Sequence, residues 1–330
     1  MEEKIDILLT TYNTKIEYLK EQIESILNQT HKNFNLIISD DCSPNEEVRE
    51  ILKQYEQKDD RITLYFQEKN LGCTKSFEFL LNKATSEYIA FSDHDDIWYP
   101  NKIEKSLEIL KQKDVSLVYC DAQQIDENGE ILQESYLKYK NMPIVSGKDF
   151  ILPFSRHIAI GCSQLFTKQV KEKMIPFSEK TFAHDWHSVY IASQLKGICC
   201  VDEQLFGYRI HGNNIFGGRN FKQNMKIWKE KKGNSYKSYL KYRYRVITET
   251  YLAGVLMCKD YNSKLEEIKL EKMQDDVIEY FEKSQKAKII YGPIYKYFKF
   301  LYFKGINKRA LKEMMILHFP LLSYIVYVLA

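Results

Sequence analysis

The stretch Phe91-Ser92-Asp93-His94-Asp95-Asp96-Ile97-Trp98 places three carboxylates within four positions, at the end of an apolar run. Residues 88–91 have the pattern of a short buried strand, so the carboxylates stand where this strand leaves a sheet. Carboxylates so close together repel one another unless a positive charge lies between them. Mg²⁺ and Mn²⁺ prefer oxygen ligands of this kind and commonly keep positions open for phosphate groups. The stretch therefore indicates a divalent-cation site, or else a solvated acidic loop before a helix that starts near Lys102.

Strand patterns and helix patterns alternate through the first 121 residues. Short apolar runs predict strands at residues 5–9, 36–39, 62–66, 88–91 and 117–119. Amphipathic segments predict helices at residues 16–27, 46–55, 76–83 and 103–110. In the first helix, Leu19, Ile23 and Ile26 fall on one face together with Leu27. This alternation predicts an α/β fold, in which helices cover both faces of a mostly parallel sheet.

Polar residues follow each of the first four predicted strands. They are Thr10-Thr11-Tyr12-Asn13, Asp40-Asp41-Cys42-Ser43, Asn70-Leu71-Gly72 and the acidic stretch at 93–96. Ser43, followed by Pro44, and Asn101 are suitable residues to begin the helices that come next. Because ligands of parallel sheets bind beyond the carboxyl ends of the strands, we expect these polar segments to share one site.

The composition is that of an ordinary globular protein, with 44% hydrophobic and 28% charged residues. A length of 330 residues leaves room for one large domain, or for a catalytic domain with an appendage. The seven Cys residues are odd in number and contain no Cys-x-x-Cys, which argues against a disulfide framework or a zinc site. The start Met1-Glu2-Glu3-Lys4 does not resemble a signal peptide, so we expect a reducing cytosol.

Residues 122–218 are less regular than the first part. Asp126-Glu127-Asn128-Gly129 predicts the turn of a hairpin, and residues 158–166 predict another strand near the site. Asp185 opens a helical segment at 188–195, and the apolar run 198–201 with Cys199-Cys200 predicts a further buried strand.

The charge is distributed unevenly behind a net value of +3, since acidic residues dominate 1–218 and basic residues dominate 219–330. The segments 222–245 and 294–303 mix Lys and Arg with aromatic residues, and 314–330 is apolar. Such helices suit an anionic membrane surface, so an interfacial or re-entrant segment is expected. The alternative is a helical appendage that docks on the catalytic domain or on a second copy, in a homo-oligomer. No nucleic-acid-binding module is recognised, so nucleic acid is not an expected partner.

An ordered set of motifs carries a family resemblance over about residues 4–218. Besides the segments quoted above, the set contains Leu8-Leu9 before Thr10, Ser25-Ile26-Leu27-Asn28-Gln29-Thr30, Glu68-Lys69 before Asn70, His184-Asp185-Trp186 and Tyr208-Arg209-Ile210-His211-Gly212-Asn213-Asn214. The set resembles family 2 inverting glycosyltransferases with the GT-A fold. Within that family it is most similar to bacterial rhamnosyltransferase-type enzymes that build surface polysaccharides.

The resemblance implies a role for each matching residue around a nucleotide-sugar donor. Asp93 and Asp95 correspond to the Asp-x-Asp pair, with Asp93 facing the ribose and Asp95 binding the metal that bridges the diphosphate. Asp96 follows the pair and supports it. Asp41 corresponds to the carboxylate that bonds the pyrimidine base, which Thr10 and Tyr12 flank.

The later motifs imply the catalytic and acceptor groups. Asp185 corresponds to the catalytic base, although an Asp that opens a helix can also be only its N-cap. Arg209 and His211 correspond to a region that binds the diphosphate or completes the metal shell; a loop hydrogen bond is the alternative for His211. Trp186 is a candidate apolar platform for the acceptor sugar.

Two residues depart from the family pattern. Cys42 stands where relatives usually have Gly, which puts the backbone of that turn and the shape of the base pocket in question. His184 stands where many relatives have Glu, so a carboxylate pair at the catalytic base is absent.

The resemblance implies a GT-A catalytic domain at 1–218, with a nucleotide-binding half at about 1–121 and an acceptor half at about 122–218, followed by a helical extension at 219–330. The expected enzyme is an inverting glycosyltransferase of the hexosyltransferase class that uses Mg²⁺ or Mn²⁺. It moves rhamnose from dTDP-rhamnose, or next a hexose from a UDP-hexose, to a lipid-linked or oligosaccharide acceptor at the cytoplasmic face of the membrane.

Alternatives from other classes are weaker. A catalytically silent scaffold that binds nucleotide sugars would not need the intact set of Asp93, Asp95 and Asp185. An aspartyl-phosphate phosphatase needs an Asp pair after the first strand, where this chain has Thr10-Thr11. A dinucleotide oxidoreductase needs Gly-x-Gly-x-x-Gly after a strand, and the sequence contains none.

Overall fold

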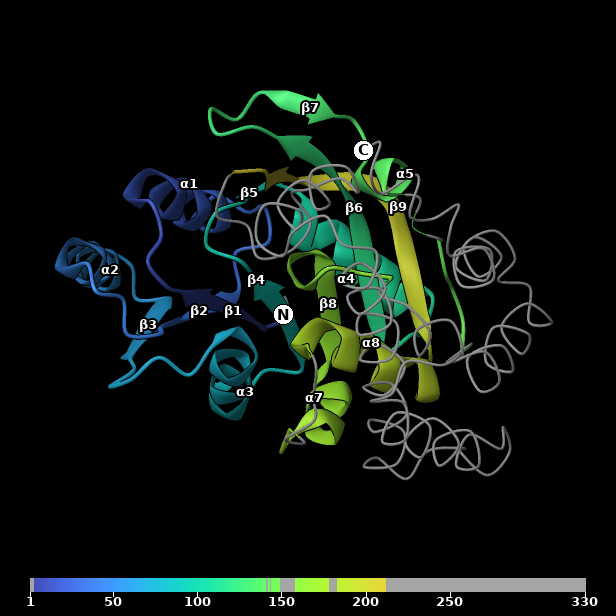
Figure 1. Ribbon diagram of the computed structural model, residues 1–330. Coiled ribbons are helices and arrows are strands. Elements are labelled where there is room, and N and C mark those ends of the chain that lie inside the picture. Colours follow the sequence, from blue (N-terminus) through green and yellow to red (C-terminus); the bar gives the residue numbers. More distant parts are fainter. Residues whose placement is uncertain (1–2, 141, 143, 149–157, 178–182, 212–330) are drawn as a thin grey trace, which may run out of the picture. The chain divides into compact units, whose positions relative to one another are not determined.

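The sheet predicted from the strand patterns forms the centre of the protein. The computed structural model describes residues 3–140, 142, 144–148, 158–177 and 183–211 (Figure 1). Within this described part, the sheet has nine strands: β1 (Ile5–Thr11), β2 (Phe34–Asp40), β3 (Ile62–Phe66), β4 (Tyr88–Ser92), β5 (Ile97–Trp98), β6 (Leu117–Ile125), β7 (Ile131–Gln133), β8 (Gln164–Thr167) and β9 (Ile198–Arg209). Their spatial order is β3-β2-β1-β4-β8-β6-β9-β5, and β7 pairs with β6.

The strand directions bring the functional segments to one edge. β1 pairs in parallel with β2 and β4, β2 with β3, and β6 with β9. β8 runs antiparallel to both of its neighbours, β4 and β6, so these two strands point the same way. The carboxyl ends of β1, β2, β4, β6 and β9 therefore lie at the same edge of a mixed, mostly parallel sheet, which confirms the predicted fold class.

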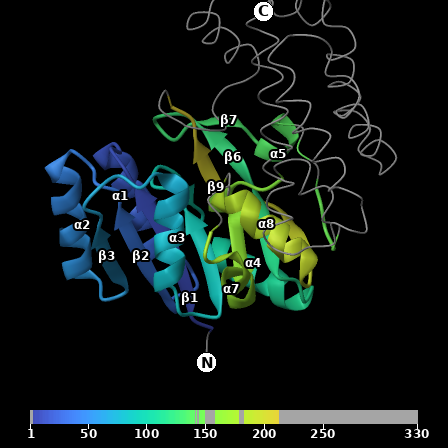
Figure 2. The ribbon, with the colours of Figure 1, turned by 60° about the horizontal axis from the view of Figure 1, so that its bottom comes forward.

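Helices lie on both faces of the sheet (Figures 1 and 2). The described helices are α1 (Ile16–Leu27), α2 (Glu46–Lys58), α3 (Cys73–Lys83), α4 (Lys102–Gln112), α5 (Tyr136–Tyr139), α7 (Lys168–Met174) and α8 (His184–Gln194), with a 3₁₀ turn, η1 (Gly161–Ser163). α8 packs against α3 and α7, and it also contacts η1. This group of helices places the start of α8 beside the carboxyl edge of β4.

The core forms between the sheet and its helices. Ile7, Leu8 and Leu9 of β1 are fully buried because helices cover both faces of this strand. On α1, Leu19 and Ile23 are also fully buried, as the helical spacing predicted. Each such side chain contributes about 1.5–3 kcal/mol through removal of its apolar surface from water, which holds the strand ends of the site in place.

The five predicted strands and four predicted helices of the first part are confirmed, with changes at some bounds. β6 continues to Ile125 instead of ending at 119. β5 has only two residues, Ile97–Trp98, and was not predicted because no periodicity can show in so short a run. The strand predicted at 158–166 is wrong in its bounds, since η1 occupies Gly161–Ser163 and the strand is Gln164–Thr167.

The predicted start of α2 at Ser43 is wrong. Asn45 is the N-cap, and its Oδ1 accepts a hydrogen bond of 3.0 Å from the backbone N–H of Glu47. The hydroxyl of Ser43 instead accepts from the N–H of Asn13, at 3.0 Å. Asn101 precedes α4 as predicted. The Asp126–Gly129 turn joins β6 to β7. A hydrogen bond from the Asp126 N–H to the Glu130 carbonyl closes it.

The basic extension at 219–330, with its segments 222–245, 294–303 and 314–330, lies outside the described residues. In the part of the chain that the structure covers, no helix has the length and apolarity needed to cross a bilayer.

Candidate active site

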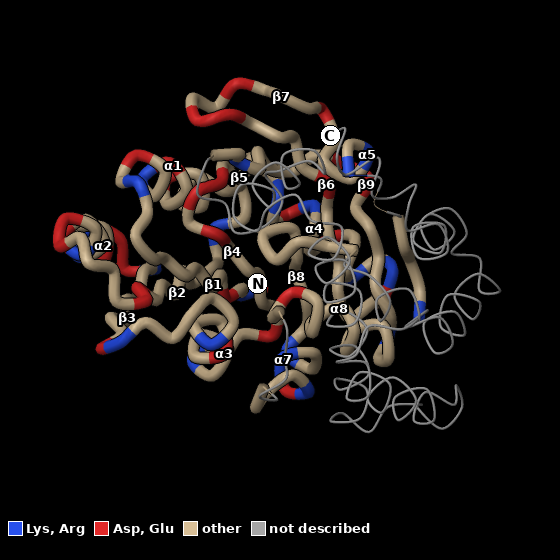
Figure 3. The backbone as a smooth tube through the Cα atoms, viewed as in Figure 1, with Lys and Arg blue, Asp and Glu red and all other residues tan. Residues whose placement is uncertain are grey.

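The ends of β1, β2 and β4 are joined by hydrogen bonds at the carboxyl edge of the sheet. The ring of His94 bonds through Nδ1 to the carbonyl oxygen of Thr10 at 3.2 Å, and the N–H of Asp41 donates to the carbonyl of Thr11 at 2.8 Å. Thr10 is 8% exposed, whereas Tyr12 is 48% exposed beside it. Acidic positions, red in Figure 3, gather along the segment that joins β4 to β5. The predicted convergence of these strand ends is therefore present.

The carboxylate of Asp41 holds the segment that follows β3. Its Oδ1 accepts from the N–H of Leu71 at 2.7 Å, and its Oδ2 accepts from the N–H of Gly72 at 2.9 Å. Cys42, next in the chain, has a φ of +64°, in the left-handed region that glycine adopts freely. The turn thus keeps the backbone shape that Gly would give, although a cysteine occupies it.

The acidic segment after β4 holds carboxylates in different environments. Oδ2 of Asp95 lies 2.7 Å from Nε2 of His211, in a hydrogen bond whose donor depends on the histidine tautomer. Asp96 is fully buried, and its Oδ1 accepts from the backbone N–H of Arg209 at 3.0 Å. Residues far apart in the sequence, at the ends of β4 and β9, therefore meet here.

These environments move the carboxyl pKa values apart. Loss of hydration, followed by the negative charge of Asp95, raises the pKa of Asp93 to about 6. Burial also raises the pKa of Asp96 well above its ordinary range. Burial opposes ionisation of Asp95 too, but the electrostatic effect of the neighbouring His94 and the hydrogen bond with His211 outweigh it and lower the pKa of Asp95. Of the three carboxyl groups, Asp95 therefore most readily carries the negative charge that a bound cation would stabilise.

A divalent cation fits these residues. The Asp95 and His211 side chains keep 13% and 12% of their surface exposed, so an ion can reach them from the solvent. Carboxylate oxygen and imidazole nitrogen are ligands that Mn²⁺ accepts, and the carboxylates also suit Mg²⁺. A cation would also lessen the repulsion between the neighbouring carboxylates.

A second donor set lies deeper. Within the described residues, ligand atoms of Asp93, Asp96 and Cys162 lie within 4.8 Å of one another. Burial, followed by the charges of Asp96 and Asp93, raises the pKa of the Cys162 thiol well above its ordinary value, so this thiol stays protonated. A protonated thiol is a poor ligand for a hard cation. Nothing in the sequence around Cys162 predicted this approach, because it depends on how η1 packs against β4.

Asp185 lies in the first turn of α8 and is not its N-cap, which is Ala183. Its Oδ2 accepts from the backbone N–H of Gly161 at 3.1 Å, and its Oδ1 accepts from the N–H of Trp186 at 2.8 Å. The interpretation of Asp185 as only a helix cap is therefore wrong. These two bonds fix the carboxylate at the turn η1.

Asp185 and the acidic segment both adjoin the same turn. Gly161 bonds Asp185, and the next residue, Cys162, approaches Asp93 and Asp96. The negative charge of Asp185 contributes to the raised pKa of Asp93. Loss of hydration, then the charges of Asp93, Asp185 and Asp41, also raise the pKa of Cys73 at the start of α3. The carboxylates of three distant motifs thus act on one thiol, which places them around the N-terminus of α3.

His184 is a packing residue. Its ring stacks on Phe77 with centroids 3.9 Å apart and meets the edge of Phe91 at 4.8 Å. A Cβ on Gly161 would lie 2.7 Å from Nε2 of His184, so this contact needs glycine. The ring thus packs in the core between Phe77, Phe91 and Gly161.

Trp186 and Arg209 are both buried. Trp186 is 3% exposed, and its role as an acceptor platform stays a prediction. Arg209 is 1% exposed, and its guanidinium donates hydrogen bonds to protein oxygens.

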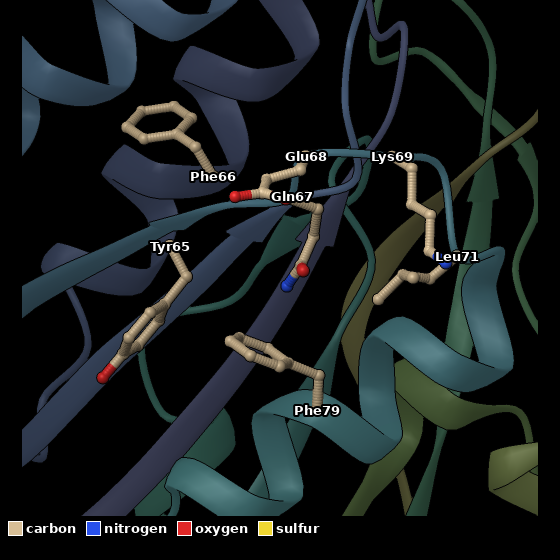
Figure 4. Close-up of a pocket in the computed structure, with 7 residues that line it drawn as sticks. All are labelled: Tyr65, Phe66, Gln67, Glu68, Lys69, Leu71 and Phe79. Atoms are coloured by element: carbon tan, nitrogen blue, oxygen red, sulfur yellow. The ribbon is translucent and has the colours of Figure 1, made fainter.

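A separate cavity of about 450 Å³ lies beside β3 and α3 (Figure 4). It is lined by Tyr65, Phe66, Gln67, Glu68, Lys69, Leu71 and Phe79. None of the predicted site residues lines it. It touches the site only through the segment 67–71, in which the N–H of Leu71 binds Asp41.

Comparison with known proteins gives one family. The sequence profile described as Glycosyl transferase family 2 matches residues 6–175. The chain is 33% identical over 285 residues to an uncharacterized glycosyltransferase, MJ1057, of Methanocaldococcus jannaschii. The aligned region covers 80% of this chain and 95% of that protein. It is 27% identical over 226 residues to TuaG of Bacillus subtilis, named as a teichuronic acid biosynthesis glycosyltransferase, covering 68% of this chain and 85% of TuaG.

Solved structures share the fold. TarS of S. aureus (residues 1–349), crystallised with UDP-GlcNAc, matches with a TM-score of 0.57 and 15% identity, over 91% of this chain and 81% of that one. The mannosyltransferase PcManGT of Pyrobaculum calidifontis, in complex with GDP-Man and Mn²⁺, matches with a TM-score of 0.54 and 11% identity, over 99% of this chain and 86% of that one. The predicted GT-A fold is confirmed by these likenesses together with the family profile.

Proposed function

The chain belongs to glycosyl transferase family 2, and on this premise we propose that it is a metal-dependent, inverting transferase of surface polysaccharide synthesis. It takes a sugar from a nucleoside diphosphate and passes it to a lipid-linked or oligosaccharide acceptor. One observation carries the proposal: Asp185 and Asp93 both approach the same turn, Gly161–Ser163, Asp185 at Gly161 and Asp93 at the next residue, Cys162. A base and a donor-binding carboxylate that both adjoin one short turn suit a displacement at one anomeric carbon.

The donor nucleotide lies along the ends of β1, β2 and β4 in this proposal. Asp41 accepts a hydrogen bond from the base; backbone N–H groups already fix its carboxylate and leave lone pairs available. Thr10 and the exposed Tyr12 flank the base, with the ring of Tyr12 available for stacking. Asp93 accepts from the ribose hydroxyls.

Asp95 and His211 hold the cation, Mg²⁺ or Mn²⁺. When bound, the cation supplies positive charge that stabilises the nucleoside diphosphate as it leaves. Arg209, which the resemblance assigns to the diphosphate region, ends β9 next to this pair. The PcManGT complex with GDP-Man and Mn²⁺ supports this arrangement only by likeness of fold.

Asp185 takes the proton of the acceptor hydroxyl as that oxygen attacks the anomeric carbon from the face opposite the diphosphate. One carboxylate is enough for a single displacement, which inverts the anomeric centre. The packed ring of His184 agrees with one base, since it fills the neighbouring space with a side chain that takes no part in the step. Trp186 contributes an apolar surface for the acceptor sugar.

The experiment is a screen of nucleotide sugars for metal-dependent release of the nucleoside diphosphate by the full chain. The family resemblance favours dTDP-rhamnose first and UDP-hexoses next. Release should require Mg²⁺ or Mn²⁺ and should fall strongly in Asp95→Asn but not in Asp202→Asn, which changes an exposed carboxylate. Tight nucleotide-sugar binding without any release, even with acceptor extracts, would favour the second candidate, a catalytically silent scaffold.

The extension at 219–330 is proposed as a basic, aromatic membrane contact, on its sequence alone. In that arrangement the catalytic domain works at the cytoplasmic face, close to a lipid-linked acceptor. The test is sedimentation of the full chain with anionic vesicles, next to a chain that ends at residue 218. Equal failure of both to bind vesicles, with a dimer seen for the full chain alone, would favour a homo-oligomer contact instead.

A further inference from the structure

The guanidinium of Arg209 donates four hydrogen bonds to the protein. Its Nε donates to the carbonyl oxygen of Asp95 at 2.8 Å, and its Nη1 donates to the carbonyls of Asp126 and Glu127 at 3.2 and 3.0 Å. Its Nη2 donates to Oε2 of Glu21 on α1, at 2.5 Å. Each nitrogen of the side chain therefore already binds a protein oxygen.

These oxygens belong to the segments that shape the proposed metal site. Arg209 binds the Asp95 carbonyl through its side chain and the Asp96 carboxylate through its backbone N–H, at 3.0 Å. It thereby fixes two neighbouring residues of the acidic segment from two directions. The next bond along β9, from the Ile210 N–H to the Ile125 carbonyl, continues the pairing with β6 and fixes Arg209 in turn.

An aromatic ring and a second ion pair support this contact. The guanidinium carbon lies 4.4 Å from the centre of the Tyr18 ring, a favourable cation–π distance. The Tyr18 hydroxyl donates to Oε2 of Glu127 at 3.2 Å, and Lys15 pairs with the same carboxylate at 2.7 Å. α1 is thus tied to the β6–β7 turn around Arg209.

The charge of a buried arginine needs a partner, and Glu21 supplies it. The Arg209 side chain is 1% exposed, whereas that of Glu21 is 50% exposed. Removing one partner of a buried charge costs more than removing an exposed pair, because the remaining charge has lost its compensation. A change at the accessible Glu21 should therefore be felt at Arg209, and through it at the Asp95 carbonyl.

We propose that Arg209, held by Glu21, is a positioning residue for the segment 93–96 and does not bind the donor diphosphate itself. Glu21 then influences the metal and donor site although it stands on α1. The inference rests on the proposed function only in assigning that segment to metal and donor; the contacts themselves do not depend on it. It also replaces the role that the family resemblance gives to Arg209.

Hydrogen exchange of the full chain, without metal or nucleotide, tests the proposal. Glu21→Gln should make the peptide that covers Ser92–Trp98 exchange about fivefold faster, which corresponds to about 1 kcal/mol of local stability. Arg209→Lys should have a larger effect, because an ammonium has only three donors and cannot bind all four acceptors of the guanidinium. The matched control is Glu24→Gln on the same helix, whose carboxylate accepts instead from the Tyr55 hydroxyl at 2.9 Å.

A titration with Mn²⁺ alone, followed by electron paramagnetic resonance, gives the second readout. Glu21→Gln should weaken Mn²⁺ binding about threefold or more, and Glu24→Gln should not. Unchanged exchange in both Glu21→Gln and Arg209→Lys would overturn the proposal. So would an Arg209→Lys variant that binds nucleotide more weakly while its exchange and its Mn²⁺ affinity stay unchanged. Neither hydrogen exchange nor Mn²⁺ binding requires that the protein transfer a sugar. If the proposed function is wrong, the protein forms no product, whereas the expected exchange difference is still observed.

Discussion

The backbone N–H of Gly161 donates a hydrogen bond of 3.1 Å to Oδ2 of Asp185. This bond joins the start of α8 to the turn η1, whose next residue, Cys162, approaches the carboxylates of Asp93 and Asp96. The candidate base and the candidate donor-binding carboxylates are therefore held by one short piece of backbone. Their separation depends on how closely that backbone can approach α8.

Asp185→Asn should lower the rate of sugar transfer about 1,000-fold, because the amide cannot take a proton from the acceptor hydroxyl. Affinity for the nucleoside diphosphate should change less than about twofold, since the role proposed for Asp185 concerns the acceptor hydroxyl and not the nucleotide. The measurements are single-turnover transfer and calorimetric nucleotide binding. Asp202→Asn serves as the control on β9, and near-normal transfer by Asp185→Asn would exclude it as the base.

Gly161→Ala should destabilise the protein and slow transfer. The new Cβ would lie 2.7 Å from Nε2 of His184 and 3.4 Å from Cβ of Asp185, so α8 or the turn must shift. A cost of about 1–3 kcal/mol in the free energy of unfolding is expected. Urea denaturation measures it.

The His184→Ala background provides the control for this change. Without the His184 ring, the main obstacle to the new Cβ is gone, so Gly161→Ala should cost clearly less there. Equal costs in both backgrounds would mean that the contact with His184 does not limit the turn.

Cys42→Gly should raise the free energy of unfolding by up to about 1 kcal/mol. The φ of +64° at Cys42 is unfavourable for a residue with a Cβ and is free of this cost for glycine. Cys42→Ala is the matched variant, because it removes the thiol and keeps the Cβ; it should bring no gain. If both variants behave alike, the thiol contact to the Glu68 carbonyl, at 3.6 Å, matters more than the backbone.

The stability of the protein should fall between pH 6.5 and pH 3 through His187. Burial, and then the neighbouring His184, lower the pKa of His187 from 6.5 to about 3 in the folded protein. In this window the unfolded chain binds a proton that the folded protein does not, so acid favours unfolding. At pH 5 the loss relative to pH 7 should be about 2 kcal/mol from this group. The centroid of the Phe177 ring lies 5.2 Å from that of the His187 imidazole in an edge contact, and this ring has no charge that could stabilise a protonated imidazole.

Urea unfolding at pH 7 and at pH 5 measures this change in the free energy of unfolding. His187→Gln cannot titrate, so its stability should change less over the same interval than that of the unaltered protein. Equal changes in the two proteins would show that other groups carry the acid sensitivity.

Local patterns were enough for the first part of the fold. A buried strand was predictable at Ile7–Leu9 and an amphipathic helix at Leu19–Ile23, because the buried residues recur in each at the spacing of its secondary structure. The direction of β8 could not be read in this way, since a four-residue strand looks the same whichever way it runs. Its bounds were missed because the 3₁₀ turn before it is also buried and consists of small residues that do not interrupt the apolar run at 158–166.

The placement of Asp41, Asp93 and Asp95 at one edge of the sheet was predictable, because these residues follow strands; their roles stay predictions. The site was not predictable where contacts join distant segments without a local pattern. Cys162 is an ordinary apolar position in sequence, yet it approaches Asp93. Arg209 suggested a phosphate ligand by its chemistry, whereas its hydrogen bonds to three carbonyls and Glu21 appear only once β9, α1 and the β6–β7 turn are assembled.

The reversed strand β8 has a consequence for anyone who wishes to re-engineer this enzyme. Because it opposes β4 and β6, the chain that enters β8 arrives at the edge where its neighbours exit, whereas Lys168 leaves at the far edge, bonded to the Glu87 carbonyl at 2.7 Å. Loop grafts intended to alter acceptor choice therefore belong upstream of Gln164 and downstream of Ser92. A tether or label is poorly placed after Thr167 even so, because α7 starts there and packs against α8, the helix that carries Asp185.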